Sequence, residues 1–410
     1  MANNNDNKVL NVPPLRFPEF SGEWKMCTIG ELTTKVGSDV TPRGGEAVYK
    51  TEGHPFVRSQ NVGLGNLLLD DIAFIDEETH LRQKNTELQF NDVLLNITGA
   101  SIGRSALVDK QIVGGNVNQH VCIIRTKENL VPSFICSFLL SNYGQRQIDS
   151  FQAGGNRQGL NFEQIKSIKI TIPSKDEQIK IAKLLRAIDE RIATQNKIIE
   201  KLQSLIKGLN DHILKNIEGD QVCFADLGEA YGGLSGKSGD DFGCGDPFIT
   251  YMNVYQNTYI SENDYELVQI APDEKQNSVQ YGDALFTLSS ETPEEVGMGA
   301  VYLGKSQKLY LNSFCFGVHF HGNRVLPQYI AHFISSTSFR KAIYPLAQGS
   351  TRFNLQKQDF MRMKFVLPSL EEQKRIATAL DALYNHLANE KLLTEQYLLL
   401  KQYLLQQMFI

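Results

Sequence analysis

Long hydrophobic runs are missing from this 410-residue sequence, and cysteine is scarce in it. No run approaches the roughly 18 apolar residues that a membrane span needs, so we expect no membrane association. Residues 1–7 are polar and lack the basic-then-apolar pattern of a secretion signal. The six cysteines are dispersed without a CxxC pair, which argues against a zinc site. We therefore expect a cytoplasmic protein with buried, reduced thiols.

Catalytic and cofactor motifs are also missing. The sequence has no GxSxG, no HExxH, no glycine fingerprint after a strand and no Asn/Asp-Pro-Pro-aromatic motif of amino-methylating enzymes. Residues 232–238 resemble a phosphate-binding loop, but Tyr231 stands where its first glycine is required, and we expect no buried strand before it. His319 and His321 share a strand face without a third ligand nearby, so we interpret them as packing or surface residues. We expect no catalytic residue, no metal and no cofactor.

The sequence also lacks an excess of positive charge. The chain carries 41 Lys and Arg against 46 Asp and Glu, a net charge of −5. This balance does not indicate nucleic-acid binding, although a local basic face can coexist with an acidic remainder. The chain does have 41% hydrophobic residues, enough for real cores, and the length of two or more domains.

The second half of the sequence repeats the first half. Residues 154–182 align without a gap with residues 349–377, at an offset of 195. Near the start of each half, residues 54–62 align with residues 246–254 at an offset of 192, so small insertions separate the matching segments. A period this long describes a domain rather than the unit of a solenoid. Two similar domains present two similar surfaces to a target with two similar halves.

A long helix is predicted at the end of each half. Ser174 and Glu177 form a predicted capping box, which Ser369 and Glu372 repeat. Apolar residues then follow at alternating steps of four and three, the pattern of a heptad seam, with Gln195 as a polar insertion. The second seam weakens beyond its first four positions, and leucines regroup over residues 398–405. The seam residues, which we expect at a helix and partner interface, are Ile181, Leu185, Ile188, Ile192, Ile199, Leu202, Ile206, Leu209, Ile376, Leu380, Leu383 and Leu387.

These helices need partners, because a single apolar seam does not stabilise an isolated helix. We expect the two helices to pack on each other, and a pseudo-two-fold relation of the halves would make them antiparallel. The alternative is that each helix folds back onto its own domain. Further apolar residues outside the seam, such as Ile179 and Leu205, suggest that another protein also docks there.

The segments before the helices mix strands and helices. Strands are predicted at residues 168–172 and 363–367 and after Asp92 and Asp283, and short amphipathic helices at residues 131–142 and 326–338. The predicted fold class is therefore α+β, with two similar mixed α/β domains joined by two long antiparallel coiled-coil helices in a pseudo-two-fold repeat.

Polar, glycine-rich loops separate these elements. Arg, Asn, Gln, Ser and Thr side chains between glycines suit contacts with base edges and phosphates. In the second half the matching loops carry different residues, among them Glu291, Glu294 and Glu295. A shared scaffold with different loops is what two domains that read different sequences require. The candidate DNA-binding residues are Arg43, Arg58, Gln60, Asn61, Thr98, Ser101, Arg104, Asn116, Asn118, Gln119, Asn156, Arg157, Lys237, Thr250, Tyr251, Asn253, Ser289, Ser290, Thr351 and Arg352.

Four segments resemble the specificity subunits of type I restriction–modification enzymes: residues 12–24, residues 97–104, and the two Pro-to-Ala segments 173–182 and 368–377. The resemblance covers essentially the whole chain. It implies two target-recognition domains, at residues 1–173 and 218–368, and two conserved helices, at residues 174–217 and 369–410.

The resemblance also implies partners. It implies double-stranded DNA, two methylation subunits docked on the helices, and motor-nuclease subunits in the full complex. This chain would then choose the sequence at which partners methylate adenine or cut.

Two DNA-reading domains at the ends of a helical rod of roughly 60 Å would contact a split, asymmetric target, with half-sites about one DNA turn apart or slightly more.

Two other functions remain open at this point. One is an enzyme with built-in methylation or nuclease activity, against which the missing motifs count. The other is a scaffold that joins proteins through its helices without reading DNA, which the negative net charge favours.

Overall fold

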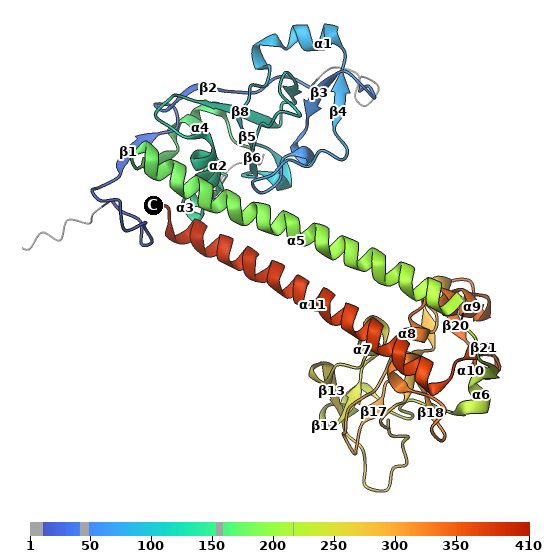
Figure 1. The fold of residues 1–410 in the computed structure, drawn as a ribbon. Helices are drawn as coiled ribbons and strands as arrows, with labels where there is room; N and C mark the ends of the chain where they lie inside the picture. The colour runs from blue at the N-terminus through green and yellow to red at the C-terminus, as the bar shows by residue number, and fades with distance from the viewer. Residues whose placement is uncertain (1–10, 42–48, 153–158, 216) are drawn as a thin grey trace, which may run out of the picture. The chain divides into compact units, whose positions relative to one another are not determined.

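The computed structural model describes residues 11–41, 49–152, 159–215 and 217–410, with side chains for all of these except residues 213–215. The chain divides into two compact units. The first unit comprises Met1–Asn196 and Leu392–Ile410, and the second comprises Lys197–Lys391. Two long helices, α5 (Lys175–Lys215) and α11 (Leu370–Gln407), each contribute one part to each unit (Figure 1).

The first unit contains three small sheets. Strands β1 and β9 pair antiparallel, whereas β3 and β7 run parallel within the three-stranded sheet. The sheets, in strand order, are β1 (Lys25–Thr28) and β9 (Lys169–Ile172); β2 (Thr33–Gly37), β8 (Val121–Thr126), β5 (Val93–Asn96) and β6 (Ser105–Leu107); and β4 (Ala73–Ile75), β3 (His54–Val57) and β7 (Asn116–Val117).

The second unit repeats this topology strand for strand. The parallel pair recurs as β12 and β17, so the sequence repeat is also a repeat of the fold. Its sheets are β10 (Asp220–Cys223) and β21 (Lys364–Leu367); β11 (Gly228–Gly232), β18 (Cys315–Phe320), β14 (Ala284–Thr287) and β16 (Gly299–Val301); β13 (Tyr265–Val268), β12 (Phe242–Ile249) and β17 (Tyr310–Leu311); and an additional β15 (Ser289–Ser290), β20 (Phe353–Leu355) and β19 (Ala347–Gln348).

Both predicted amphipathic helices form, as α2 and α8, and a second helix follows each of them, α3 and α9. Ser141 ends the first helix of one pair and caps the second through its hydroxyl, and Ser336 caps the second helix of the other pair. A serine side chain that accepts a backbone N–H offers the chain a local alternative to continuing the helix. The helices are α1 (Glu77–Arg82), α2 (Pro132–Leu140), α3 (Asn142–Ser150), α4 (Phe162–Ser167), α6 (Phe224–Leu227), α7 (Tyr251–Gln256), α8 (Pro327–Ile334), α9 (Thr337–Ile343) and α10 (Lys357–Met361).

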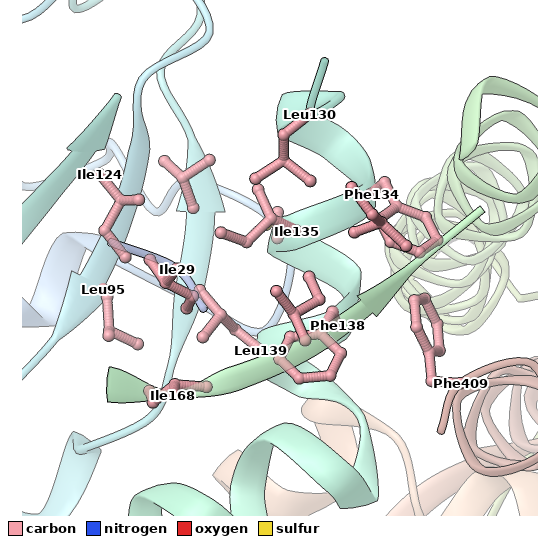
Figure 2. Close-up of a cluster of buried hydrophobic side chains, with 14 of the residues drawn as sticks. Ile29, Leu95, Ile124, Leu130, Phe134, Ile135, Phe138, Leu139, Ile168 and Phe409 are labelled. Carbon is pink, nitrogen blue, oxygen red and sulfur yellow. The ribbon is translucent and has the colours of Figure 1, made fainter. Parts of the chain in front are cut away.

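The core of the first unit includes the last residues of the chain. Figure 2 shows Phe409 beside Phe134 and Phe138 of α2, and the rings of Phe409 and Phe134 are 5.2 Å apart. Phe409 is fully buried. Since buried aromatic rings contribute strongly to stability, the carboxyl-terminal segment is an integral part of this unit.

The core of the second unit is aromatic. Phe224 contacts the rings of Phe286, Phe339, Phe360 and Phe365. Ile376, Ala377 and Leu380 from the beginning of α11 join the same cluster. Helix and domain therefore share one core, which holds the start of α11 against the sheets.

Only half of each predicted capping box forms. Ser174 accepts the backbone N–H of Glu177 at 3.4 Å, and Ser369 accepts that of Glu372 at 3.3 Å. The prediction that the glutamates reach back to the cap was wrong. The Glu177 carboxylate instead accepts from Arg16, and that of Glu372 accepts from Arg375. A charged donor outcompetes a neutral backbone N–H because charge-assisted hydrogen bonds are stronger.

Within each unit the two long helices run antiparallel, as predicted. In the first unit Lys401 contacts Asp189 at 2.6 Å, while Met408 joins the core cluster that contains Ile181. In the second unit Ile206 and Leu387 line one hollow, while Leu209 packs against the core cluster that contains Leu380. The alternative of helices folded back on their own domains is also partly realised, because the same clusters include sheet and helix residues of each domain.

The seam continues along α11 beyond the four predicted leucine and isoleucine positions. Thr394 is buried there, and Lys401 is largely buried. Leu404 and Leu405 are buried, whereas Leu399 is 64% exposed. The regrouped leucines therefore belong to two faces of the helix, one inside the first unit and one at the surface.

Two further expectations are tested by this structure. Among the described residues no helix is long and apolar enough to cross a membrane. All six cysteines are free thiols, but Cys244 is exposed and Cys223 is half-buried, so the expectation of buried thiols is wrong for these two. Cys244 lies on β12 in a stretch of four consecutive exposed residues, a local exposure that composition does not reveal.

Candidate nucleic-acid interface

Four loops of the first unit meet at one edge of its sheets. The bridge between Thr98 and Gly159 joins the loop after β5 to the segment before α4. The backbone N–H of Ile97 donates to His120 at 3.0 Å, which adds the loop between β7 and β8. The Asn96 side chain donates to the Ser59 carbonyl at 2.8 Å, which adds the turn after β3.

The same frame recurs in the second unit. Leu288 donates to Phe314 and Leu355 donates to Leu288, both at 2.8 Å, so the corresponding loops converge. Ser289 stands opposite Asn354 in the β15–β20 pair, where the first unit has the Thr98–Gly159 bridge. We call these two places the loop edges of the first and second units. Their backbones match, and their side chains differ.

Buried asparagines hold both loop edges together. Asn61 is fully buried, and its amide donates to Leu68 at 2.8 Å and to Asp71 at 3.0 Å. Asn253 is the matching residue of the second unit and donates to Ser261 at 2.8 Å. Their donors are used within the fold, and buried polar groups cannot give up such bonds cheaply. The amide donors of Asn61 and Asn253 are therefore engaged within the fold, which disfavours their predicted contact with DNA.

Asn116 and Asn118 are structural residues for the same reason. Asn116 is fully buried, donates to Gln83 at 3.0 Å and bonds to His80 at 2.7 Å. Asn118 is 6% exposed and accepts the backbone N–H of His120 at 3.1 Å. Both side chains are buried, which disfavours the adenine contacts that the sequence predicts for them.

Asp71 accepts hydrogen bonds from the polar side chains that follow β3. Arg58 donates to its backbone carbonyl at 2.6 Å and lies 3.4 Å from its carboxylate, while the ring of Tyr49 lies 5.4 Å from the guanidinium. Gln60 also donates to the Asp71 carboxylate. Arg58 is thus held against its own loop with a side chain 20% exposed, whereas Gln60 is an exposed residue.

The remaining candidates of the first unit differ in exposure. Arg104 and Gln119 are exposed, and Thr98 and Ser101 are half-buried. Thr98 bonds to His120 at 2.5 Å. Arg43, Asn156 and Arg157 lie outside the described residues.

Lys237, a predicted DNA-binding residue, forms an ion pair within the second unit. Its ammonium contacts Glu274 at 2.5 Å, its side chain is 8% exposed, and the hydrogen bond to Lys237 holds the pKa of Glu274 at about 2. The loop that contains Lys237 follows strand β11, in which Glu229 and Ala230 are exposed, so this strand is not the buried strand that precedes a phosphate-binding loop. Tyr231 belongs to that strand and donates to Asp283, and it fills the place of the glycine that a phosphate-binding loop needs.

Asp283 ties His319 into the sheet of the second unit. His319 lies 2.7 Å from Asp283 and stacks on Tyr231, which supports its interpretation as a packing residue. Burial raises the pKa of Asp283. In the first unit Asp92 occupies the matching place and pairs with Arg125 at 2.7 Å. The same scaffold position thus holds a pair of different chemistry in each unit.

The other second-unit candidates surround a hollow of about 320 Å³ at its loop edge. Tyr251 is half-buried and donates to the Ser289 carbonyl at 2.8 Å. Thr250 caps α7 by accepting the backbone N–H of Asn253, and Thr351 is exposed beside the hollow. The residues that line the hollow are Tyr251, Met252, Tyr255, Ser289, Ser290, Glu291, Glu295, Phe314 and Arg352.

Sequence reasoning missed two residues of the loop edges, His120 and Phe314. Each follows an asparagine by two positions, Asn118 and Asn312, whose side chain accepts its backbone N–H. Extending the alignment of the halves across this segment would have paired them. Phe314 is 56% exposed and lines the hollow at the loop edge of the second unit.

Comparison with known proteins gives a consistent result. A family model described as type I restriction modification DNA specificity domain matches residues 21–204 and 237–396. The EcoKI specificity subunit of Escherichia coli (strain K12) is 23% identical, over 88% of this chain and 82% of the relative. The putative MjaX specificity subunit of Methanocaldococcus jannaschii is 21% identical, over 92% of this chain and 90% of the relative.

Solved structures show the same fold. The type I restriction–modification S subunit from M. genitalium has a TM-score of 0.58 at 15% identity, covering 97% of this chain and 99% of that chain. The HsdS subunit from Thermoanaerobacter tengcongensis has a TM-score of 0.51 at 15% identity, covering 96% of this chain and 97% of that chain.

Proposed function

The chain belongs to the family of type I restriction modification DNA specificity domains, and on this premise we propose that it is the subunit that selects the DNA sequence on which a type I restriction–modification complex acts. It performs no chemistry itself. It directs adenine methylation, and cleavage where a nuclease subunit is present, to a chosen target in the cytoplasm.

One observation carries this proposal: the two loop edges share a backbone frame but present different side chains. The edge of the first unit offers Gln60, Gln119 and Arg104, whereas the edge of the second offers Tyr251, Glu291 and Arg352. Readers of different chemistry on one chain select a target with two different halves. We therefore propose a split, asymmetric target, read by residues 1–173 and 218–368 as the two recognition domains.

Within each domain the side chains divide between two roles. The exposed candidates Gln60, Arg104 and Gln119, with Thr351 and Arg352, are proposed to contact bases or phosphates. Loss of a base contact relaxes one position of the target, at a cost of about 1–3 kcal/mol, while loss of a phosphate contact weakens binding to all sequences.

The long helices are proposed to bind two methylation subunits. Leu392, Leu399 and Tyr403 of α11 are each more than half exposed, and their spacing of seven and four residues places them on one helical face. An exposed apolar face on a helix favours a protein partner. Motor-nuclease subunits would join through that complex.

A matched pair of variants tests this docking face. Leu399→Ser should reduce copurification with the methylation subunit without changing the stability of the chain, because the side chain is already in solvent. Gln402→Ser, at an exposed polar position nearby, is the control and should bind normally. Equal binding of both variants would remove Leu399 from the interface.

The function itself is tested by methylation sequencing. Cells that express this chain with its methylation partner are compared with cells that lack the chain. We expect methyl-adenine at one split, asymmetric motif that disappears without the chain. No new motif, with the partner shown to be active and bound, would instead support a scaffold that joins proteins without reading DNA.

A further inference from the structure

The hollow at the loop edge of the second unit combines groups of opposite hydrogen-bonding character. The β15–β20 pair ends with Ser290 opposite Phe353, and Glu291 and Arg352 are the residues that adjoin this last pair. Both side chains are exposed and both line the hollow. Neither forms an ion pair within the described part of the chain. An acceptor and a donor therefore stand side by side and are available to a ligand.

The other walls of the hollow are aromatic and fixed in place. Tyr251 and Tyr255 stack at 6.0 Å, and both hydroxyls are engaged, with Ser289 and with Glu295 respectively. The loop that carries the glutamates is held from behind by Arg340, which donates to the carbonyls of residues 294, 296 and 297. Preformed walls spare the ordering cost that a flexible loop would incur on binding.

We propose that this hollow reads a C·G base pair in the second half of the target, with Glu291 on cytosine and Arg352 on guanine. This inference rests on the proposed function. In the major groove cytosine offers an amino donor, which a carboxylate accepts, and its guanine partner offers the O6 and N7 acceptors, which arginine binds with two donors. The adjacent acceptor and donor of the hollow match the two edges of one base pair.

The other base pairs fit this arrangement less well. Adenine also offers an amino donor, but its thymine partner offers Arg352 only one acceptor, O4. Thymine and guanine present only acceptors to the Glu291 carboxylate. Tyr255 and Glu295 do not touch the base in this assignment; they position the wall. In the first unit Ala100 stands at the position that matches Glu291, so that unit reads its half-site with other groups.

The test uses the complex of the full chain with its methylation subunit. DNA duplexes that are randomised in the second half-site are methylated and sequenced, for the wild type, Glu291→Gln and Arg352→Gln. The control is Glu294→Gln, an exposed neighbour that does not line the hollow. We expect both test variants to lose about tenfold or more of the discrimination at one C·G position, with the first half-site unchanged.

A second probe isolates the guanine contact. Replacing that guanine with 7-deazaguanine removes the N7 acceptor, so it should slow methylation by the wild type and not by Arg352→Gln.

Several results would overturn the assignment. One is that the second half-site contains no C·G pair, and another is that the test variants keep the base preference of the wild type. A third is that the variants methylate all sequences more weakly without a change in base preference, because such a result indicates a phosphate contact. A wild-type complex that methylates no split motif would instead refute the proposed function. The two failures are therefore distinguishable.

Discussion

Removing Arg16 should destabilise the first unit far more than a surface ion pair would. The Arg16 guanidinium donates to both oxygens of Glu177, at 2.7 and 2.8 Å, and to the carbonyl of Gly22 at 2.6 Å. The Glu177 side chain is 1% exposed, so in Arg16→Met its charge would remain buried without a partner. Breaking such a pair costs about 3–5 kcal/mol.

The lower end of that range is the expected value here. Arg16 itself is 16% exposed, so water can approach the carboxylate once the guanidinium is gone. We expect a loss of about 3 kcal/mol in the free energy of unfolding. In Arg16→Met with Glu177→Gln the buried group is neutral, so part of this loss should be recovered.

The single tryptophan provides the assay. Trp24 is 3% exposed and lies in the core of the first unit, so its fluorescence during denaturant unfolding reports on that unit. The control is Arg186→Met, which removes an exposed ion pair with Glu190 on α5 and should cost below about 1 kcal/mol.

Three outcomes bear on the reasoning. A loss near 3 kcal/mol for Arg16→Met, with a small effect for Arg186→Met, supports the buried pair as a major contribution. If Arg16→Met unfolds within about 1 kcal/mol of the wild type, the pair does not stabilise the unit. If the double variant is less stable than Arg16→Met, the uncompensated charge is not the cause of the loss.

Three further predictions concern the cores. Phe409→Ala should cost about 3–5 kcal/mol in the fluorescence-detected transition, because the ring is fully buried; an unchanged transition would contradict its place in the core. Burial lowers the pKa of His332 despite its hydrogen bond to Asp381. The unfolded state therefore binds the proton more readily than the folded state, and the second unit should lose stability as the pH falls below about 6.5. Circular dichroism at pH 7.5 and 5.5 checks this, and His332→Asn should show a smaller difference between the two. Iodoacetamide at pH 8 should alkylate exposed Cys244 and spare Cys122, whose pKa burial raises to about 12; mass spectrometry that found both modified equally fast would refute this.

The net charge of −5 does not show which charges the fold leaves exposed to a ligand. Lysines and arginines that the composition counts as positive are in part used internally, as in the pairs Arg16–Glu177 and Lys237–Glu274. Which charged side chains remain at the surface depends on their position in the fold and not on the net charge of the chain. The function therefore depends on which charges the fold leaves exposed.

The sequence by itself determined the repeat, the fold class and the heptad seams. These are periodic or local signals, since a helix or strand of given amphipathicity needs only its own residues to be recognised. Short stretches of sequence correctly predicted the starts of β5 and β14 and the helix caps at Ser174 and Ser369.

Only the tertiary structure decided which polar side chains remain available at the loop edges. Asn61 and Gln60 are neighbours of similar chemistry, yet one is fully buried and the other exposed. The partner of Glu177 lies 161 residues away, and Phe409 completes a core built largely from the other end of the chain. Burial and pairing are set by contacts between distant segments, and no local pattern encodes them.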